Sequence, residues 1–121
     1  MIYHNILEAV GNTPLIRLNR MPEPGSAEIL VKMEGLNVGG SIKTRTAYNM
    51  IRIAEKEGKI KPDTIIVEPT SGNQGIGLAL VGAVKGYKTI IIMPDSVMHY
   101  RIRGLIIWFT TTFLRLSVIL P

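Results

Sequence analysis

The sequence predicts an α/β fold with a parallel sheet that contains a βαβ crossover. Residues 64–68 and 89–94 are two short runs rich in β-branched side chains, as expected of buried strands. Between them, residues 75–85 are nearly all small or apolar, and Gly86 supplies a typical helix stop. A strand, a helix and a strand in this order form a crossover with parallel strands. The uniformly apolar run 89–94 predicts a strand that is covered on both faces.

The elements ahead of this crossover are expected to be shorter. Residues 7–11 predict a brief helix that ends near Gly11. Pro14 then favours an extended chain before it, which leads into the run 15–18. Residues 29–34 form a further strand candidate.

A longer helix is predicted from Ser41, directly after the glycine-rich stretch 35–40. Apolar side chains recur at helical spacing on one face, and charged side chains occupy the other. The apolar positions are Ala47, Met50, Ile51 and Ala54. Gly58 is expected to close this helix.

Composition limits the classes of protein that the chain can represent. At 121 residues and 46% hydrophobic, the chain can form one compact domain. It contains no cysteine, which excludes disulfides, thiolate zinc sites and a cysteine nucleophile. His4 and His99 lack further ligands at usable spacing, so no metal site is predicted. The N-terminus has no basic segment followed by an apolar one, so we expect no secretory signal and a cytoplasmic protein.

The basic character of the chain does not predict nucleic-acid binding. Residues 1–84 hold nine basic and eight acidic side chains, whereas residues 85–121 hold five basic and one acidic. The excess positive charge therefore lies in the last third, and the earlier charges alternate in sign without forming a basic patch.

The first candidate functional loop runs from Gly39 to Arg45 and places Lys43 in the first turn of the predicted helix. Its two adjacent glycines allow the backbone to approach a ligand closely. Cations at a helix N-terminus are unfavourable by a few tenths of a kcal/mol unless an anion lies nearby. Lys43 and Arg45 are therefore either part of a ligand site or solvated surface cations.

The second candidate loop, residues 68–77, leaves a strand and opens a helix. Its backbone amides and the Thr70, Ser71 and Asn73 side chains can hold a carboxylate or a phosphate. Ser71 and Gln74 also have the spacing of a capping box, in which they would satisfy the helix amides instead. The glycine spacing matches neither the dinucleotide fingerprint nor the P-loop.

Read with the segment from Gly11 to Leu15, the order and spacing of both loops resemble the fold-type II pyridoxal-phosphate enzymes, whose fold is tryptophan synthase β-like. The cysteine synthase (O-acetylserine sulfhydrylase) branch is the most similar. The resemblance implies that Lys43 forms a Schiff base with pyridoxal 5′-phosphate and that Asn73 contacts the phenolic oxygen of the cofactor. It also implies a substrate-carboxylate loop made of Thr70, Ser71, Gly72, Asn73 and Gln74.

The resemblance further implies a β-replacement reaction that makes cysteine. O-acetylserine displaces Lys43, the freed amine removes the α-proton, acetate leaves and sulfide adds. Cystathionine β-synthase-like or diaminopropionate synthase-like activities share this chemistry. A non-catalytic remnant, or a fragment that docks onto a partner, is the alternative from another class. Complete members of the family are commonly homodimers.

Two positions depart from the family pattern. Thr44 stands where an aspartate usually follows the lysine, and its hydroxyl can cap a helix but cannot neutralise Arg45. Gln74 stands where threonine is commoner, which bears on substrate preference more than on cofactor binding.

The end of the sequence also departs from the family. Residues 1–96 are interpreted as the N-terminal part of such an enzyme, and residues 97–121 as a divergent hydrophobic tail of frameshifted or prematurely stopped origin. The resemblance places the glycine-rich loop for the cofactor phosphate beyond this chain, so weak cofactor binding and little or no activity are expected. Residues 105–120 include Arg115 and fall short of the about 20 apolar residues that span a bilayer, so a membrane anchor is not expected.

Overall fold

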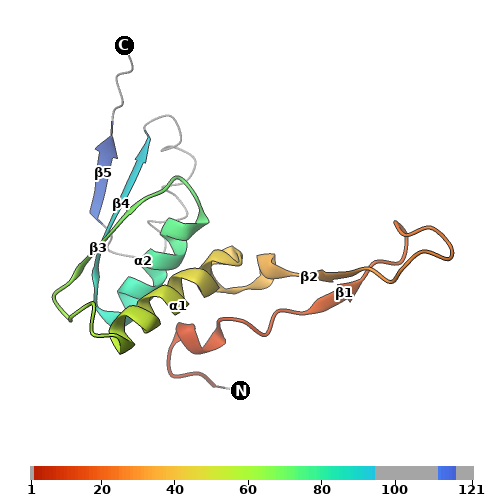
Figure 1. Cartoon of the computed structure of the whole chain (residues 1–121), viewed down its shortest axis with the longest axis horizontal. Coiled ribbons are helices and arrows are strands. Elements are labelled where there is room, and N and C mark those ends of the chain that lie inside the picture. The colour runs from red at the N-terminus through yellow and green to blue at the C-terminus, as the bar shows by residue number, and fades with distance from the viewer. Residues whose placement is uncertain (1, 95–111, 117–121) are drawn as a thin grey trace, which may run out of the picture.

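The computed structural model of the chain describes residues 2–94 and 112–116. Its α-helices and strands, in chain order, are β1 (Leu15–Arg17), β2 (Leu30–Lys32), α1 (Lys43–Lys56), β3 (Ile65–Pro69), α2 (Asn73–Lys85), β4 (Lys88–Pro94) and β5 (Thr112–Leu116). Three 3₁₀ turns lie among them, η1 (Ile6–Ala9), η2 (Glu34–Leu36) and η3 (Val38–Gly40). β3, β4 and β5 form a parallel sheet in that order, and β1 pairs with β2 antiparallel (Figure 1). The predicted α/β class and the β3–α2–β4 crossover are confirmed.

The crossover helix α2 lies on one face of the sheet. Alternate residues of β4, at Thr89, Ile91 and Met93, are buried, whereas Ile90 and Ile92 on the opposite face are half-buried. The predicted cover is confirmed on the face that packs against α2, and cover of the opposite face stays a prediction.

Helix α1 packs against α2 and completes the core. The buried core cluster consists of Leu7, Ala47, Ile51, Leu78, Leu80 and Val81. Burying a side chain such as Ile51 contributes about 1.5–3 kcal/mol to stability. The predicted apolar face of α1 is confirmed at Ala47 and Ile51, but Met50 is 52% exposed because it lies at the rim of the contact between the helices. The helix ends at Lys56, and Gly58 follows with a φ of 67°, which matches its predicted role as a helix stop.

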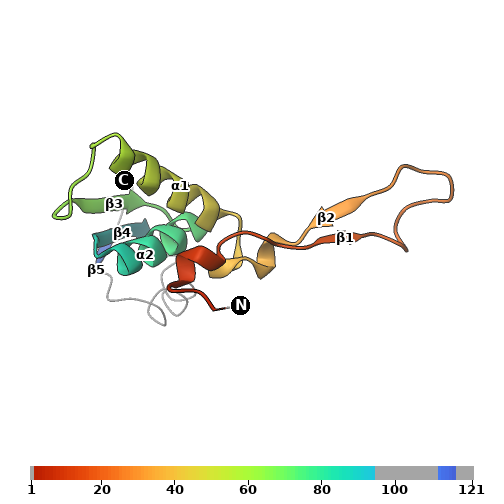
Figure 2. The same cartoon turned by 90° about the horizontal axis from the view of Figure 1, so that it is seen from below.

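The N-terminal elements are a 3₁₀ turn that packs on the core and a projecting hairpin. In η1, the Asn5 side chain accepts a hydrogen bond from the Leu7 amide, and Leu7 is buried in the core. This turn confirms the predicted brief helix. The hairpin of β1 and β2 extends away from the helices and the sheet in both views (Figures 1 and 2). Its Leu15 and Leu30 side chains are exposed. The sequence indicated both extended runs, but not that they pair with each other.

β5 lies inside the segment that the sequence assigned to a divergent tail. It pairs with β4 in a parallel register that joins Ile90 to Thr112 and Pro94 to Leu116. Across the described ranges, the structure contains no helix of the length and apolarity that a membrane span requires.

Candidate functional site

Lys43 is the first residue of α1, as the sequence predicted. The turn before it contains Gly39 and Gly40 with φ angles of 79° and 73°, a region that side chains with a Cβ rarely adopt. The Ser41 Oγ accepts a hydrogen bond of 3.2 Å from the Lys43 amide. The Lys43 side chain is exposed, and its ammonium takes part in none of the hydrogen bonds or ion pairs among the described residues.

Thr44 does not use its hydroxyl to cap the helix. The N-cap position is Ile42, which has no side-chain cap, and the Ser41 hydroxyl serves the nearby amide instead. Thr44 is 0% exposed, and its Oγ1 has no hydrogen-bond partner among the described residues. A Cβ on Gly39 would lie only 2.5 Å from this oxygen, so the hydroxyl packs against the glycine backbone. As the second residue of α1, Thr44 points its side chain into the core, away from the helix N–H groups that have no partner within the helix.

The second loop begins where β3 ends at Pro69. The Thr70 amide donates to the Ile92 carbonyl at 2.9 Å, which extends the contact between β3 and β4 by one residue. The Thr70 Oγ1 accepts a hydrogen bond of 3.1 Å from the Gly72 amide. α2 starts directly afterwards, at Asn73, with Gly72 as its N-cap.

The capping box between Ser71 and Gln74, which the sequence offered as the alternative to a ligand-binding loop, does not form. Because Gly72 is the N-cap, Ser71 lies one residue outside the helix and Gln74 is its second residue, so neither has the required position. The Gln74 Nε2 instead lies 3.6 Å from the Met50 Sδ on α1, within a weak hydrogen bond. Among the described residues, the only side-chain hydrogen bond within this turn is the one that the Thr70 Oγ1 accepts from the Gly72 amide.

The first loop packs against the first turns of α2. A Cβ on Gly77 would approach the Lys43 carbonyl oxygen to 3.0 Å and the Ala47 Cβ to 2.9 Å, so the two helices are in contact through backbone at this point. A Cβ on Gly39 would lie 3.8 Å from the Ile76 side chain. The fold therefore brings the start of α1 to the start of α2, although Lys43 and Asn73 are 30 residues apart in the sequence.

A hollow of about 310 Å³ lies at the carboxyl ends of β3 and β4, where open parallel sheets usually bind ligands. It is lined by Pro69, Thr70, Ser71, Ile92, Met93 and Pro94. Two residues of the predicted substrate loop, Thr70 and Ser71, thus face this hollow. Lys43 and Asn73 are not among its lining residues, and no hydrogen bond joins the Lys43 side chain to the 70–74 loop within the described ranges.

A hydrogen-bonded cluster at the base of the first loop was not predicted from the sequence. Both Glu34 carboxylate oxygens bind Arg45, with Nε–Oε2 and Nη2–Oε1 distances of 3.0 and 2.9 Å. The same carboxylate accepts from the Thr13 Oγ1 at 2.6 Å and from the Asn37 Nδ2 at 3.1 Å. The hydrogen bonds from Arg45, and next those from Thr13, hold the pKa of Glu34 at about 2 and outweigh its partial burial. Glu34 is therefore the anion that Arg45 requires near the helix N-terminus.

Asn37 extends this cluster to the glycine-rich loop. Its Oδ1 accepts hydrogen bonds from the Gly11 and Val38 amides, at 2.9 and 3.0 Å, and its carbonyl accepts from the Gly40 amide at 2.8 Å. Periodicity could not reveal the long-range contacts of this cluster, because Gly11 and Asn37 are 26 residues apart and Thr13 and Arg45 are 32 residues apart. The one feature of the sequence that could have indicated this cluster is an acidic residue, Glu34, at the end of a strand candidate just before the glycine-rich stretch.

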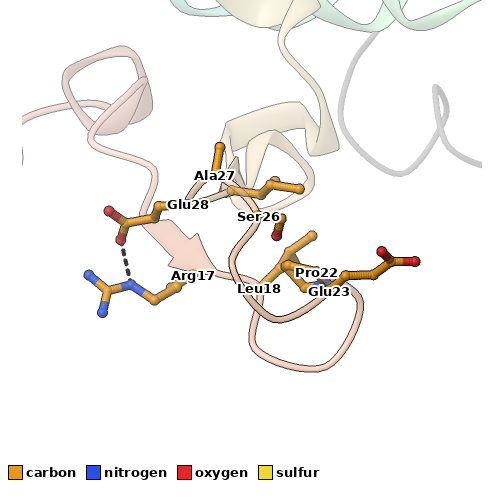
Figure 3. Close-up of a pocket in the computed structure, with 8 residues that line it drawn as sticks. Arg17, Leu18, Pro22, Glu23, Ser26, Ala27 and Glu28 are labelled. Atoms are coloured by element: carbon orange, nitrogen blue, oxygen red, sulfur yellow. Dashed lines mark ion pairs between the residues drawn. The ribbon is translucent and has the colours of Figure 1, made fainter.

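The hairpin carries a separate open hollow of about 300 Å³ (Figure 3). An exposed ion pair between Arg17 and Glu28 lies beside it. Its lining comes from β1 and the hairpin loop only, so it shares no residue with the loops around Lys43. In the described ranges, no group of three or more His, Cys, Asp or Glu side chains is arranged to hold a metal ion.

Comparison with known proteins gives a family match. Residues 6–108 match the family model described as "Pyridoxal-phosphate dependent enzyme". A probable cysteine synthase of Bacillus subtilis is 48% identical over 101 residues, which cover 84% of this chain and 32% of the relative. A cystathionine beta-synthase of Apis mellifera is 52% identical over 106 residues, 86% of this chain and 21% of the relative.

A solved structure agrees with these matches. The crystal structure of a hydrogen sulfide-producing enzyme from Fusobacterium nucleatum superposes with a TM-score of 0.88 at 43% identity, over 98% of this chain and 38% of that one. The chain thus spans about a third or less of the length of the curated relatives described above.

Proposed function

Because the chain belongs to the pyridoxal-phosphate dependent enzyme family, in its cysteine synthase-like group, we propose that Lys43 attaches the cofactor covalently. We further propose that the whole protein catalyses β-replacement on an O-activated serine. The position of Lys43 supports this proposal. Its side chain is exposed and makes no hydrogen bond or ion pair among the described residues, at a helix start packed against the start of α2.

The residues present fit pyridoxal phosphate in their chemistry. An aldehyde condenses with an unprotonated primary amine, and the Lys43 amine is free of competing ion pairs in the described part of the chain. Asn73 is exposed at the start of α2, where its amide can donate to a phenolic oxygen. When bound, the cofactor supplies an electron sink for the carbanion formed at the substrate Cα.

The 70–74 loop is proposed to hold the substrate carboxylate. The first amides of α2 lack partners within the helix and lie at the positive end of its dipole. The Thr70 oxygen already accepts a hydrogen bond from the Gly72 amide, which leaves its O–H free to donate to a carboxylate. The Ser71 hydroxyl and the Asn73 amide are both exposed, whereas Gln74 would have to turn away from Met50 to join them.

Lys43 is proposed to act twice. When the amino group of the substrate displaces it, its Nζ becomes free to accept the proton from the substrate Cα. A carboxylate fixed by the 70–74 loop would orient that C–H bond toward the amine, which is catalysis by positioning.

The substrates are proposed to be O-acetylserine and sulfide, as the similarity to a probable cysteine synthase suggests. The 52% identity to a cystathionine beta-synthase favours one second candidate, in which a thiol amino acid replaces sulfide as the nucleophile. Both reactions use the same Lys43 and 70–74 loop. Assaying the whole protein with O-acetylserine and either nucleophile distinguishes them by product.

Titration with pyridoxal phosphate tests the attachment. The wild-type chain should develop the visible absorbance of a lysine adduct, and Lys43→Ala should lose it. Lys56→Ala is the matched control, because Lys56 is an exposed lysine in the last turn of the same helix. Equal absorbance in Lys43→Ala and the wild type would refute the assignment of Lys43. An adduct at Lys43 without turnover of O-acetylserine by the whole protein would refute the catalytic part alone.

A further inference from the structure

The Glu34 carboxylate lies where the two segments that flank Lys43 are anchored. We propose that Glu34 is a positioning residue for Lys43: it fixes the start of α1 and the glycine-rich loop in one arrangement, so that the lysine amine is presented beside α2. The chemical consequence rests on the proposed function of Lys43. No hydrogen bond or ion pair joins Glu34 to Lys43 itself, so Glu34 acts through its neighbours.

The anchor on the C-terminal side of Lys43 is Arg45. Its guanidinium binds both Glu34 oxygens in a two-point fork, a geometry that fixes direction as well as distance. The Arg45 Nη2 also donates to the Thr13 Oγ1 at 3.1 Å. A Cβ on Gly11 would lie 3.0 Å from the Arg45 Nη1, so the guanidinium rests on the backbone of the N-terminal segment. The first turn of α1 cannot rotate without breaking these contacts.

The anchor on the N-terminal side of Lys43 is Asn37. It is buried, and its amide donates to Glu34, which orients its oxygen toward the Gly11 and Val38 amides. Its carbonyl holds the Gly40 amide at the opposite end of the turn. The loop from Val38 to Ile42 therefore starts from a fixed residue and ends in a fixed helix, and both connect to one carboxylate.

A carboxylate is the group that this arrangement requires. The donors from Thr13, Asn37 and Arg45 supply four hydrogen bonds, two to each oxygen of Glu34. A carboxylate only accepts, and its two oxygens can take about four bonds. A glutamine has the same shape, but its NH₂ group would face two donors, so about half of the bonds would be lost.

Two measurements on the full chain test the proposal. The first is amide hydrogen exchange of residues 38–45, which reports how firmly this segment is anchored. The second is labelling with pyridoxal phosphate, fixed by borohydride. The fraction of label on Lys43, relative to the other lysines, reports how accessible the Lys43 amine is to the cofactor. Glu34→Gln should speed exchange in 38–45 by about tenfold and lower the Lys43 fraction several-fold. Glu28→Gln is the matched control, because it also removes a carboxylate bound to an arginine, but on the distant hairpin. It should leave both measurements unchanged.

A second variant separates anchoring from general stability. Glu34→Gln leaves Arg45 without its counterion, whereas the double variant Glu34→Leu/Arg45→Met removes both charges and should fold as judged by circular dichroism. It should still show fast exchange in 38–45. Wild-type exchange and labelling in a folded variant of either kind would overturn the proposal. Absence of Lys43 label in the wild type would refute the proposed function, while the exchange comparison would still decide whether Glu34 anchors the loop.

Discussion

Replacing Thr44 by valine should stabilise the protein, because it removes a buried hydroxyl that has no partner. Thr44 is 0% exposed, and its Oγ1 makes no hydrogen bond among the described residues. A buried polar group left without a partner costs about 1–3 kcal/mol. Valine has a similar shape and helix propensity, but its methyl group is larger than the hydroxyl and meets the Gly39 backbone. The expected gain is therefore at the lower end, about 1 kcal/mol.

Urea and thermal unfolding measure this difference. A gain of about 1 kcal/mol raises the melting temperature of a chain of this size by roughly 4 °C. Thr46→Val is the matched control, because Thr46 is exposed on the same helix, and its change should stay within about 0.5 kcal/mol. If Thr44→Val destabilises the protein by about 1 kcal/mol or more, either the hydroxyl has a partner or crowding of the methyl group against Gly39 exceeds the gain, and the expected stabilisation is refuted.

The remaining predictions concern the contact between the helices and the response to acid. Gly77→Ala should destabilise the protein by about 1–3 kcal/mol, although alanine has the better helix propensity, because the new Cβ meets the Lys43 carbonyl and Ala47. The same unfolding assay measures this loss. Gly35→Ala is the control, because its new Cβ would meet nothing within 4 Å. The pKa of Glu34 is lowered from 4.5 to about 2 on folding, so its stabilising contribution is complete above pH 4.5 and is lost as the pH falls toward 2. Unfolding free energies measured across that range should therefore fall more steeply for the wild type than for Glu34→Gln, and equal slopes would contradict the lowered pKa of Glu34.

The sequence predicted the elements whose signals are local. The apolar run of α2 and its stop were identified, and Gly86 has the expected left-handed conformation with a φ of 82°. The start of α2 was missed by two residues, because Asn73 and Gln74 are polar and carry no apolar period. The same shift explains why Ser71 and Gln74 do not form a capping box. A cap depends on which residue leaves the helical backbone, and here that residue is Gly72.

Contacts between distant segments could not be predicted in this way. Lys43 was located correctly within its helix, but its approach to α2 depends on Gly77, whose missing Cβ lets the helices touch. The ion pair between Glu34 and Arg45 spans 11 residues and two different elements, so neither period nor motif spacing indicates it. β5 likewise joins the sheet from the segment that the sequence analysis interpreted as a divergent tail. These features arise from packing, which a linear pattern does not encode.

The proposed function depends on the Lys43 amine being the group that captures pyridoxal phosphate. Treating the folded chain with the cofactor, reducing with borohydride and mapping the labelled peptides measures this directly. We expect the label on the peptide that contains Lys43, in preference to the other lysines of the chain. Label spread evenly over the exposed lysines, or confined to a different one, would contradict the account.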